Sequence, residues 1–342
     1  MTSFRAHWAR FRESPFLPAC VLMLVLAAAA GLFAGSYTFA MANPTPHRLP
    51  IGVTGPPDPR AAAFAAEMDR TLDTEIRFTT YATYENAREA IDEQKIFAII
   101  RSGGDNRVSL EIASAAGASV AQLLVESASE AARKTGVNVT FQDLKPLQSG
   151  DPRGLAIFYI TLAAVILGFV GAIQLSVHAR ELNPAERVAF TLANALLGAF
   201  TIVAVVDWWI GALDLPLPES WAILALTLFA SAMVFSMFNA LVGRWAMLPT
   251  WGLMVLLGNP SSGGAVSWAL LPSVLGTIGR WLPPGASVNA QHTAVYFRGH
   301  QHAFPFLVLA GWAAVSTAVF WIWRGRHPGG REKEPTPDTG TA

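Results

Sequence analysis

Residues 246–282 read AMLPTWGLMVLLGNPSSGGAVSWALLPSVLGTIGRWL, and they decide how often the chain can cross a membrane. Two apolar pieces, 246–257 and 265–282, are separated by Gly258-Asn259-Pro260-Ser261-Ser262-Gly263-Gly264. No helix is expected to continue through this break, because proline lacks a backbone N–H and glycine is unfavourable inside a helix. The first piece alone is short for a full crossing, since a bilayer core of about 30 Å needs about 20 helical residues. Together the two pieces predict either one net crossing or two.

The composition around this stretch is that of a membrane protein. Of 342 residues, 52% are hydrophobic and only 14% are charged, whereas soluble domains carry about 25% charged residues. The formal net charge is zero, so the basic field of a nucleic-acid-binding protein is missing. The single Cys20 excludes an intrachain disulfide and cysteine-rich metal sites. We therefore expect a lipid bilayer as the surroundings, with no nucleic acid and no cofactor.

Outward from the break, apolar segments predict five further crossings. The first, residues 16–42, is much longer than the apolar core of a signal peptide, although Ala40-Met41-Ala42 resembles a cleavage site. We therefore favour a retained helix over a cleaved leader. The other four crossings lie between 154 and 323: Leu155–Val177, Val188–Leu213, Trp221–Val242 and Ala303–Trp323.

Arginine and lysine at the ends of these segments predict the orientation, because cytoplasmic loops carry the excess of basic residues. Basic residues lie before the first crossing, in the loop His178–Arg187 and after the last crossing, whereas Asp214–Ser220 has none. This pattern fits cytoplasmic termini and an extracytoplasmic block 43–153. It also favours six crossings over seven, with 258–285 as a re-entrant or interfacial helical segment on the outer side.

The two ends of the chain have their own patterns. Phe4, Trp8 and Phe11 fall on one helical face, which predicts a cytoplasmic amphipathic lead-in over residues 1–15. A disordered basic lead-in is the alternative. The tail, residues 324–342, is rich in proline, glycine and charge, which predicts disorder in the cytoplasm.

The block 43–153 alternates strand-like and helix-like segments, and its order β-α-β-α-β-β-α-β predicts a small α/β domain. The fold class is therefore an α-helical polytopic membrane protein of six transmembrane helices plus a re-entrant helix, with an inserted extracytoplasmic α/β domain. About 100 residues suffice for a separate core.

Motifs for chemistry are missing, and we expect no enzyme. The chain has no Walker A sequence, no HExxH and no GxSxG. His292, His300 and His302 cluster before the last crossing, but without a neighbouring acid or cysteine they indicate a solvated loop rather than a metal site.

Polar side chains inside membrane segments are costly, and they indicate either a translocation path or contacts that hold the bundle together. For the path we expect the following residues to contribute: Asp207, Asn194, Asn239, Asn259, Pro260, Ser261, Ser262, Gly263 and Gly264. Interfacial placement of Asp207 beside Trp208, and amide bonds between helices, are the alternatives.

One membrane helix, an outer α/β domain and five more crossings resemble the layout of ABC-2-type permeases. The residues 258–264, Leu271-Pro272 and Trp281-Leu282-Pro283-Pro284-Gly285 resemble the signature of the phage infection protein (YhgE/Pip-like) and DUF3533 membrane-protein branch. The resemblance implies a plasma or inner membrane permease that works as a homodimer, with its ATPase on a separate polypeptide. It also implies an ATPase-contact loop that contains Arg180, Glu181, Glu186 and Arg187.

Two functions remain open at this point. The first is a permease subunit of an export system. The second is a non-transporting receptor, or an accessory protein for secretion or envelope assembly, that acts through the outer domain.

Overall fold

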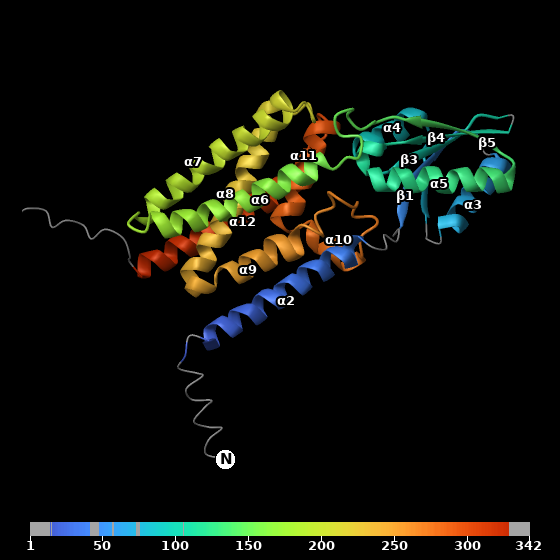
Figure 1. Cartoon of the computed structure of the whole chain (residues 1–342). Coiled ribbons are helices and arrows are strands. Elements are labelled where there is room, and N and C mark those ends of the chain that lie inside the picture. Colours follow the sequence, from blue (N-terminus) through green and yellow to red (C-terminus); the bar gives the residue numbers. More distant parts are fainter. Residues whose placement is uncertain are drawn as a thin grey trace, which may run out of the picture.

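The computed structural model describes residue 14 and residues 16–41, 48–56, 58–72, 76–104 and 106–327. It has two parts, a helical bundle and a small α/β domain at one end of that bundle (Figure 1). Apart from Ser14, the expected lead-in over residues 1–15 lies outside the described residues, as do residues 328–342 of the expected tail.

Among the described residues, five helices are long and apolar enough to cross a membrane. This count supports a membrane protein and agrees with the five uninterrupted crossings expected from the sequence. Two of the helices continue into short π or 3-10 turns, η2 (Ala204–Trp209) and η3 (Gly243–Trp245). The five helices are α2 (Phe16–Met41), α6 (Ala156–His178), α7 (Pro184–Val203), α8 (Leu217–Val242) and α12 (Ala303–Arg326).

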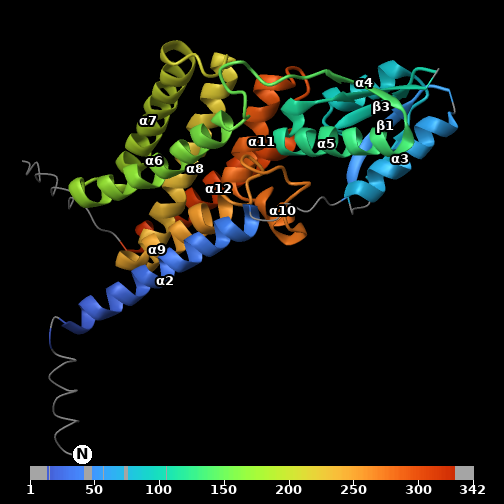
Figure 2. The ribbon, with the colours of Figure 1, turned by 45° about the vertical axis from the view of Figure 1, so that its right-hand side comes forward.

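Helix α8 forms the centre of the bundle, where it packs against α6, α7 and α12. Helix α2 lies at the edge of the bundle (Figure 2). Its contact with the bundle includes Phe33, whose ring lies 6.1 Å from that of Trp251. Most of its apolar side chains are exposed, as Leu24 shows at 67%. An apolar helix with this exposure requires lipid or another protein around it.

Local sequence explains where the bundle helices begin and end. Asn183 and Glu186 form a reciprocal capping box at the start of α7, and the Asp151 carboxylate accepts bonds from the backbone N–H groups of Leu155 and Ala156 at the start of α6. Such caps satisfy backbone donors that have no partner inside the helix.

Helix α12 continues to Arg326, so the expected disordered tail cannot begin at 324 and at least its first three residues are helical.

The region 246–282 contains no long helix, so the crossing expected there is not one continuous element. The chain forms α9 (Met247–Trp251) and η4 (Gly252–Gly258), leaves helical geometry after the break, and forms α10 (Ser273–Gly279). A further helix, α11 (Pro283–Tyr296), then begins. The sequence predicted the interruption. It did not predict α11, whose residues after Gly285 we expected in a loop.

The α/β domain has its elements in the expected order. Its five strands form one mixed sheet in the order β2-β1-β3-β4-β5. The β3–β4 pair is antiparallel, and the other neighbours are parallel. The elements are β1 (Leu49–Thr54), α3 (Pro59–Leu72), β2 (Ile76–Thr80), α4 (Tyr84–Asp92), β3 (Ala98–Ser102), β4 (Arg107–Ile112), η1 (Ser114–Ala116), α5 (Ala118–Thr135) and β5 (Asn138–Asp143).

The sheet buries both faces, because side chains alternate along each strand. In β3, Ala98 and Ile100 belong to the core under α3 and α5, whereas Ile99 belongs to the core under α4. The larger core also includes Leu270, which comes from the interrupted region of the bundle. The interruption is therefore packed into the α/β domain.

Candidate functional site

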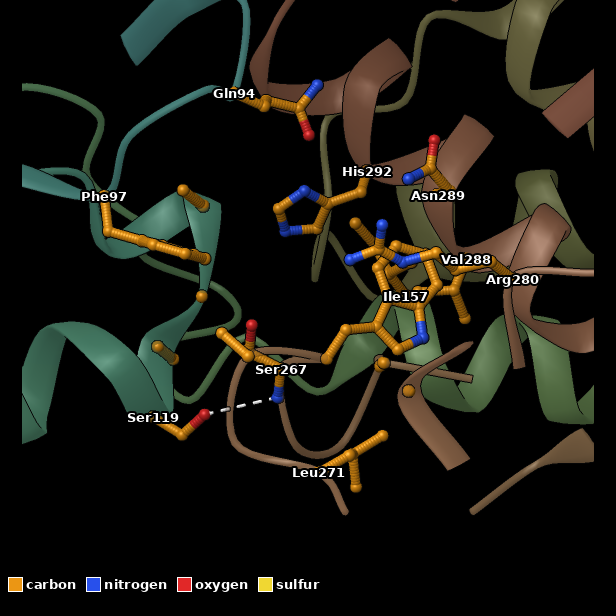
Figure 3. Close-up of a pocket in the computed structure, with 18 of the residues that line it drawn as sticks. Gln94, Phe97, Ser119, Ile157, Ser267, Leu271, Arg280, Val288, Asn289 and His292 are labelled. Carbon is orange, nitrogen blue, oxygen red and sulfur yellow. Dashed lines mark hydrogen bonds between the residues drawn. The ribbon is translucent and has the colours of Figure 1, made fainter. Parts of the chain in front are cut away.

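A cavity of about 800 Å³ lies between the α/β domain and the interrupted region of the bundle. We call it the junction cavity. Gln94 and Phe97 line it from the domain, and Arg280, Asn289 and His292 line it from the bundle. Figure 3 shows the His292 and Arg280 side chains directed into the space between these two walls. A cavity of this size is typical of a small-molecule site.

Glycines allow the interruption to fold as tightly as it does. A Cβ on Gly279 would lie 1.8 Å from the Ser261 carbonyl oxygen, and one on Gly285 would lie 2.1 Å from the Gly279 carbonyl oxygen. Any other residue at these positions would collide with backbone. The residues 258–264 and 279–285 therefore form one closely packed unit, although they are far apart in sequence.

Hydrogen bonds hold the floor of the cavity. Ser261 Oγ donates to the Leu257 carbonyl at 2.6 Å, and Trp268 Nε1 donates to the Ser261 carbonyl at 2.9 Å. Gly263 has a φ of +81°, and a Cβ there would lie 2.6 Å from the Trp268 ring. These contacts satisfy backbone groups that the broken helix leaves free, as a low-dielectric environment requires.

Helix α11 is attached to the bundle through buried polar side chains. Thr227 Oγ1 donates to Ser287 Oγ at 2.8 Å, and Gln291 Nε2 donates to the Ser220 carbonyl at 2.8 Å. Ser220, Thr227, Ser287 and Gln291 are each 0% exposed. Hydrogen bonds of this kind fix helices against one another where apolar packing alone gives little direction.

The α/β domain is fixed to the bundle by further hydrogen bonds. Gln94 Nε2 donates to Thr293 Oγ1 at 2.9 Å, and Asp214 N donates to Gln148 Oε1 at 2.6 Å. Ser267 N donates to Ser119 Oγ at 3.4 Å, close to the cavity wall (Figure 3). Both walls of the cavity are thus held in place relative to each other.

Positive charge dominates the junction cavity. Arg48, Arg153 and Arg280 line it, and Arg280 lies 5.0 Å from the centroid of the Trp268 ring. Among the described lining residues the one carboxylate is that of Glu93, which is bonded to Lys95 Nζ at 2.5 Å. That hydrogen bond raises the pKa of Lys95 above its ordinary value, so the charge of Glu93 is compensated outside the cavity.

The aromatic and cationic lining has a chemical consequence. Phe97, Trp268, Trp281 and Phe304 provide apolar surface beside the arginines. Arginine presents a planar fork of donors that matches a carboxylate or phosphate. The cavity therefore suits a molecule with an anionic group and an apolar part.

The residues predicted for a substrate path separate into two groups. Gly263 and Gly264 line the junction cavity. Asn259, Ser261 and Ser262 do not line it and are each at most 2% exposed, and Pro260 is buried with them. Asn259 lies near the Tyr37 hydroxyl of α2. Of these six consecutive residues, two therefore line the cavity and four are buried.

The three path residues predicted elsewhere do not line this cavity. Asp207 Oδ2 accepts a bond from Leu215 N at 3.3 Å in the turn after α7, so it shapes the α7–α8 connection. Asn194 is exposed on α7, and its Nδ2 atom lies 2.7 Å from where a Cβ on Gly171 would be. Asn239 lines a different pocket at the opposite end of the bundle.

The predicted ATPase-contact loop joins α6 to α7 at the end of the bundle away from the α/β domain (Figure 1). Arg180 and Glu181 are exposed there. Glu186 accepts a bond from Asn183 N at 3.0 Å. Arg187 is only 8% exposed and donates from Nη2 to the Ala179 carbonyl at 3.2 Å. This hydrogen bond joins the beginning of the loop to α7.

Sequence reasoning missed Arg280, Asn289 and the cavity position of His292. The available signal was Pro283-Pro284, because proline is favoured in the first turn of a helix, and here it starts α11. His292 and His302 line the cavity, whereas His300 does not. No group of three or more metal-ligating side chains occurs in the part of the chain that the structure describes.

No protein-family model matches the chain, and neither the curated proteins nor the solved structures compared with it give a match.

Proposed function

We propose that the chain is a permease-like membrane subunit of an ABC-2-type export system, without an ATPase of its own, and that it works as a homodimer. The observation that carries the proposal is the interrupted helix at Gly258 and Pro284, which opens onto the junction cavity. Transporters commonly build their substrate sites from discontinuous helices.

The two pieces of the interrupted helix are long enough to make one crossing together. The element 247–258 and α11 have 12 and 14 residues, or about 18 Å and about 21 Å at about 1.5 Å per helical residue. Neither piece alone spans a bilayer core of about 30 Å, but their sum does. In this proposal they form the fifth of six crossings, and the α/β domain faces away from the cytoplasm.

Charge supports this orientation. The α6–α7 loop, the end of α8 and the end of α12 lie at the end of the bundle away from the α/β domain (Figure 1), and these segments carry Arg180, Arg187, Arg244, Arg324 and Arg326. The α7–α8 connection at the domain end carries no lysine or arginine. Basic residues gather on the cytoplasmic side of membrane proteins, so this difference between the connecting loops supports an outward-facing domain end.

The junction cavity supports export of an anionic amphiphile. It lies beside the outer half of the interrupted helix, and its arginines and aromatic rings match an acidic group and an apolar part. In the proposed cycle a partner ATPase drives two protomers against each other, and substrate leaves past α11. The exposed apolar surface of α2 is available to lipid or to the second protomer.

The test is purification of the tagged full chain from its native membranes, followed by mass spectrometry and measurement of ATP hydrolysis. We expect a co-purifying ATPase whose activity is sensitive to vanadate. A charge-reversal variant, Arg180→Glu with Glu181→Lys, should lose the ATPase while the matched variant Arg107→Glu, in the α/β domain, keeps it. Repeated recovery of the intact chain with no ATPase would contradict the proposal.

A receptor or accessory role is the second candidate, and the α/β domain favours it. This domain has its own core and contributes one wall of the cavity. Replacing residues 48–150 by a flexible linker separates the two functions. Loss of partner binding with unchanged efflux of an anionic amphiphile would favour the receptor, whereas loss of efflux would favour the permease.

A further inference from the structure

A second polar pocket of about 240 Å³ lies at the end of the bundle away from the α/β domain. We call it the basic pocket. Arg180 and Arg187 line it from the α6–α7 region, Arg324 and His327 line it from the end of α12, and Asn239 lines it from the end of α8. Two parts of the chain that are distant in sequence, the α6–α7 region and the end of α12, therefore bring cationic groups to one small space.

The lining of this pocket is rich in positive charge. No aspartate or glutamate is among its described lining residues. The guanidinium of Arg187 is nearly buried and donates a hydrogen bond to the neutral Ala179 carbonyl, and Arg324 lines the same small pocket. Buried cations normally have an anionic partner, because desolvation without one is costly. The arrangement is that of a site which receives an anion.

The position of the pocket at the ends of the apolar helices indicates which kind of anion it would bind. It lies where the apolar helices α6, α8 and α12 end, which is the level of the lipid headgroups if these helices span a bilayer. Trp323 and Phe320 also line it, and aromatic side chains are enriched at that level. Basic pockets between membrane helices are suited to phosphate-bearing headgroups.

We propose that the basic pocket binds the phosphate group of an anionic lipid in the leaflet away from the α/β domain. The proposal does not depend on the export function. The arginines would donate hydrogen bonds to the phosphate oxygens, and the acyl chains would lie along the neighbouring apolar helices. Bound lipid would link the α6–α7 loop to the end of α12.

The experiment uses the full chain in mild detergent, with native mass spectrometry to count retained lipid. Phosphatidylglycerol, phosphatidylcholine and inorganic phosphate are added in separate arms. The wild type should retain phosphatidylglycerol over phosphatidylcholine. Arg324→Gln and Arg180→Gln should each weaken that retention about fivefold, the usual effect of one basic residue near an anionic membrane surface. Arg326→Gln is the matched control, because Arg326 is on the same helix but does not line the pocket.

Each other outcome overturns the proposal. Equal retention of the two lipids by the wild type, or an equal loss in Arg326→Gln, would show that the pocket does not select an anionic headgroup. Displacement of phosphatidylglycerol by millimolar inorganic phosphate would assign the pocket to a free anion instead. Circular dichroism of each variant confirms folding, and Arg187→Gln is used only if its spectrum matches the wild type.

Discussion

Gly258, the last residue of η4, lies directly against Pro284 near the start of α11: a Cβ on Gly258 would be 2.7 Å from Pro284 Cγ. The two half-helices therefore meet end to end, and the residues between them form the floor of the junction cavity. Because the two pieces meet so closely, we expect the small residues around the break to be sensitive to substitution.

Gly279→Ala should destabilise the bundle, because the new Cβ would collide with the Ser261 carbonyl oxygen. A backbone carbonyl, unlike a side chain, cannot rotate away to remove the collision. Overpacking of this kind typically costs about 1–3 kcal/mol. Thermal unfolding of the purified chain in detergent measures the effect. Gly252→Ala is the control, since nothing lies within 4 Å of its Cβ position, and an equal loss in both variants would contradict the proposed packing.

Leu270→Ala should destabilise the α/β domain although Leu270 belongs to the interrupted region. Its side chain is 2% exposed and lies in the domain core, and truncating a buried leucine costs about 2–5 kcal/mol. Hydrogen exchange of β1, β3 and α5 in the full chain reports the loss. Val274→Ala, at 65% exposed, should have little effect, and unchanged exchange in Leu270→Ala would show that the two parts are not coupled.

The sequence alone could predict local features of the structure but not the distant contacts on which these two predictions depend. Long apolar runs and alternating segments are local patterns, so they predicted the uninterrupted membrane helices and the order of the α/β domain. The break at 258–264 was predicted for the same reason, because proline and glycine act on their own backbone. The packing of Leu270 into a domain core that begins at Leu49 involves a distant contact that no local pattern encodes.

The junction cavity shows the same limit. Gln94 from the α4–β3 turn, Ser119 from α5 and Arg280 from the interruption line one cavity. Their separation in sequence is why local patterns did not predict it. The sequence pattern favours Pro283-Pro284 as the end of a helical segment, whereas the two prolines begin α11. Proline stops a helix that precedes it and also favours the first turn of one that follows, and only tertiary context distinguishes the two.

Arg101→Ala should be more damaging than its surface position suggests. Glu111 is 0% exposed, and the Arg101 guanidinium reaches it at 2.8 Å, while the Tyr84 hydroxyl donates to it at 2.5 Å. Removing Arg101 leaves a buried carboxylate with only part of its compensation, and an uncompensated buried charge costs about 3–5 kcal/mol. Urea unfolding of the full chain, followed by domain-specific hydrogen exchange, measures this cost.

The double variant Arg101→Ala with Glu111→Gln provides the control, because it removes the charge together with its partner. It should recover part of the stability lost in Arg101→Ala. The result that contradicts the account is a double variant no more stable than Arg101→Ala alone. Burial of the hydroxyl and its bond to Glu111 also raise the pKa of Tyr84, so the neutral phenol remains the donor well above neutral pH.

Arg280→Gln should weaken binding of an anionic amphiphile to the junction cavity without unfolding the chain. Arg280 is exposed at the cavity wall, and hydrogen bonds to charged groups contribute about 1.5–3 kcal/mol when water is excluded and less at an exposed site. We therefore expect about a threefold to tenfold loss of affinity for a fluorescent long-chain carboxylate, measured in nanodiscs. Arg107→Gln, at a distance on β4, should bind as the wild type does.

An uncharged ligand separates charge selection from cavity shape. The same fluorophore on an uncharged long-chain alcohol should bind equally to the wild type, Arg280→Gln and Arg107→Gln, since only the ionic contact has been changed. A parallel loss of affinity for the alcohol would mean that Arg280 shapes the cavity and does not select charge.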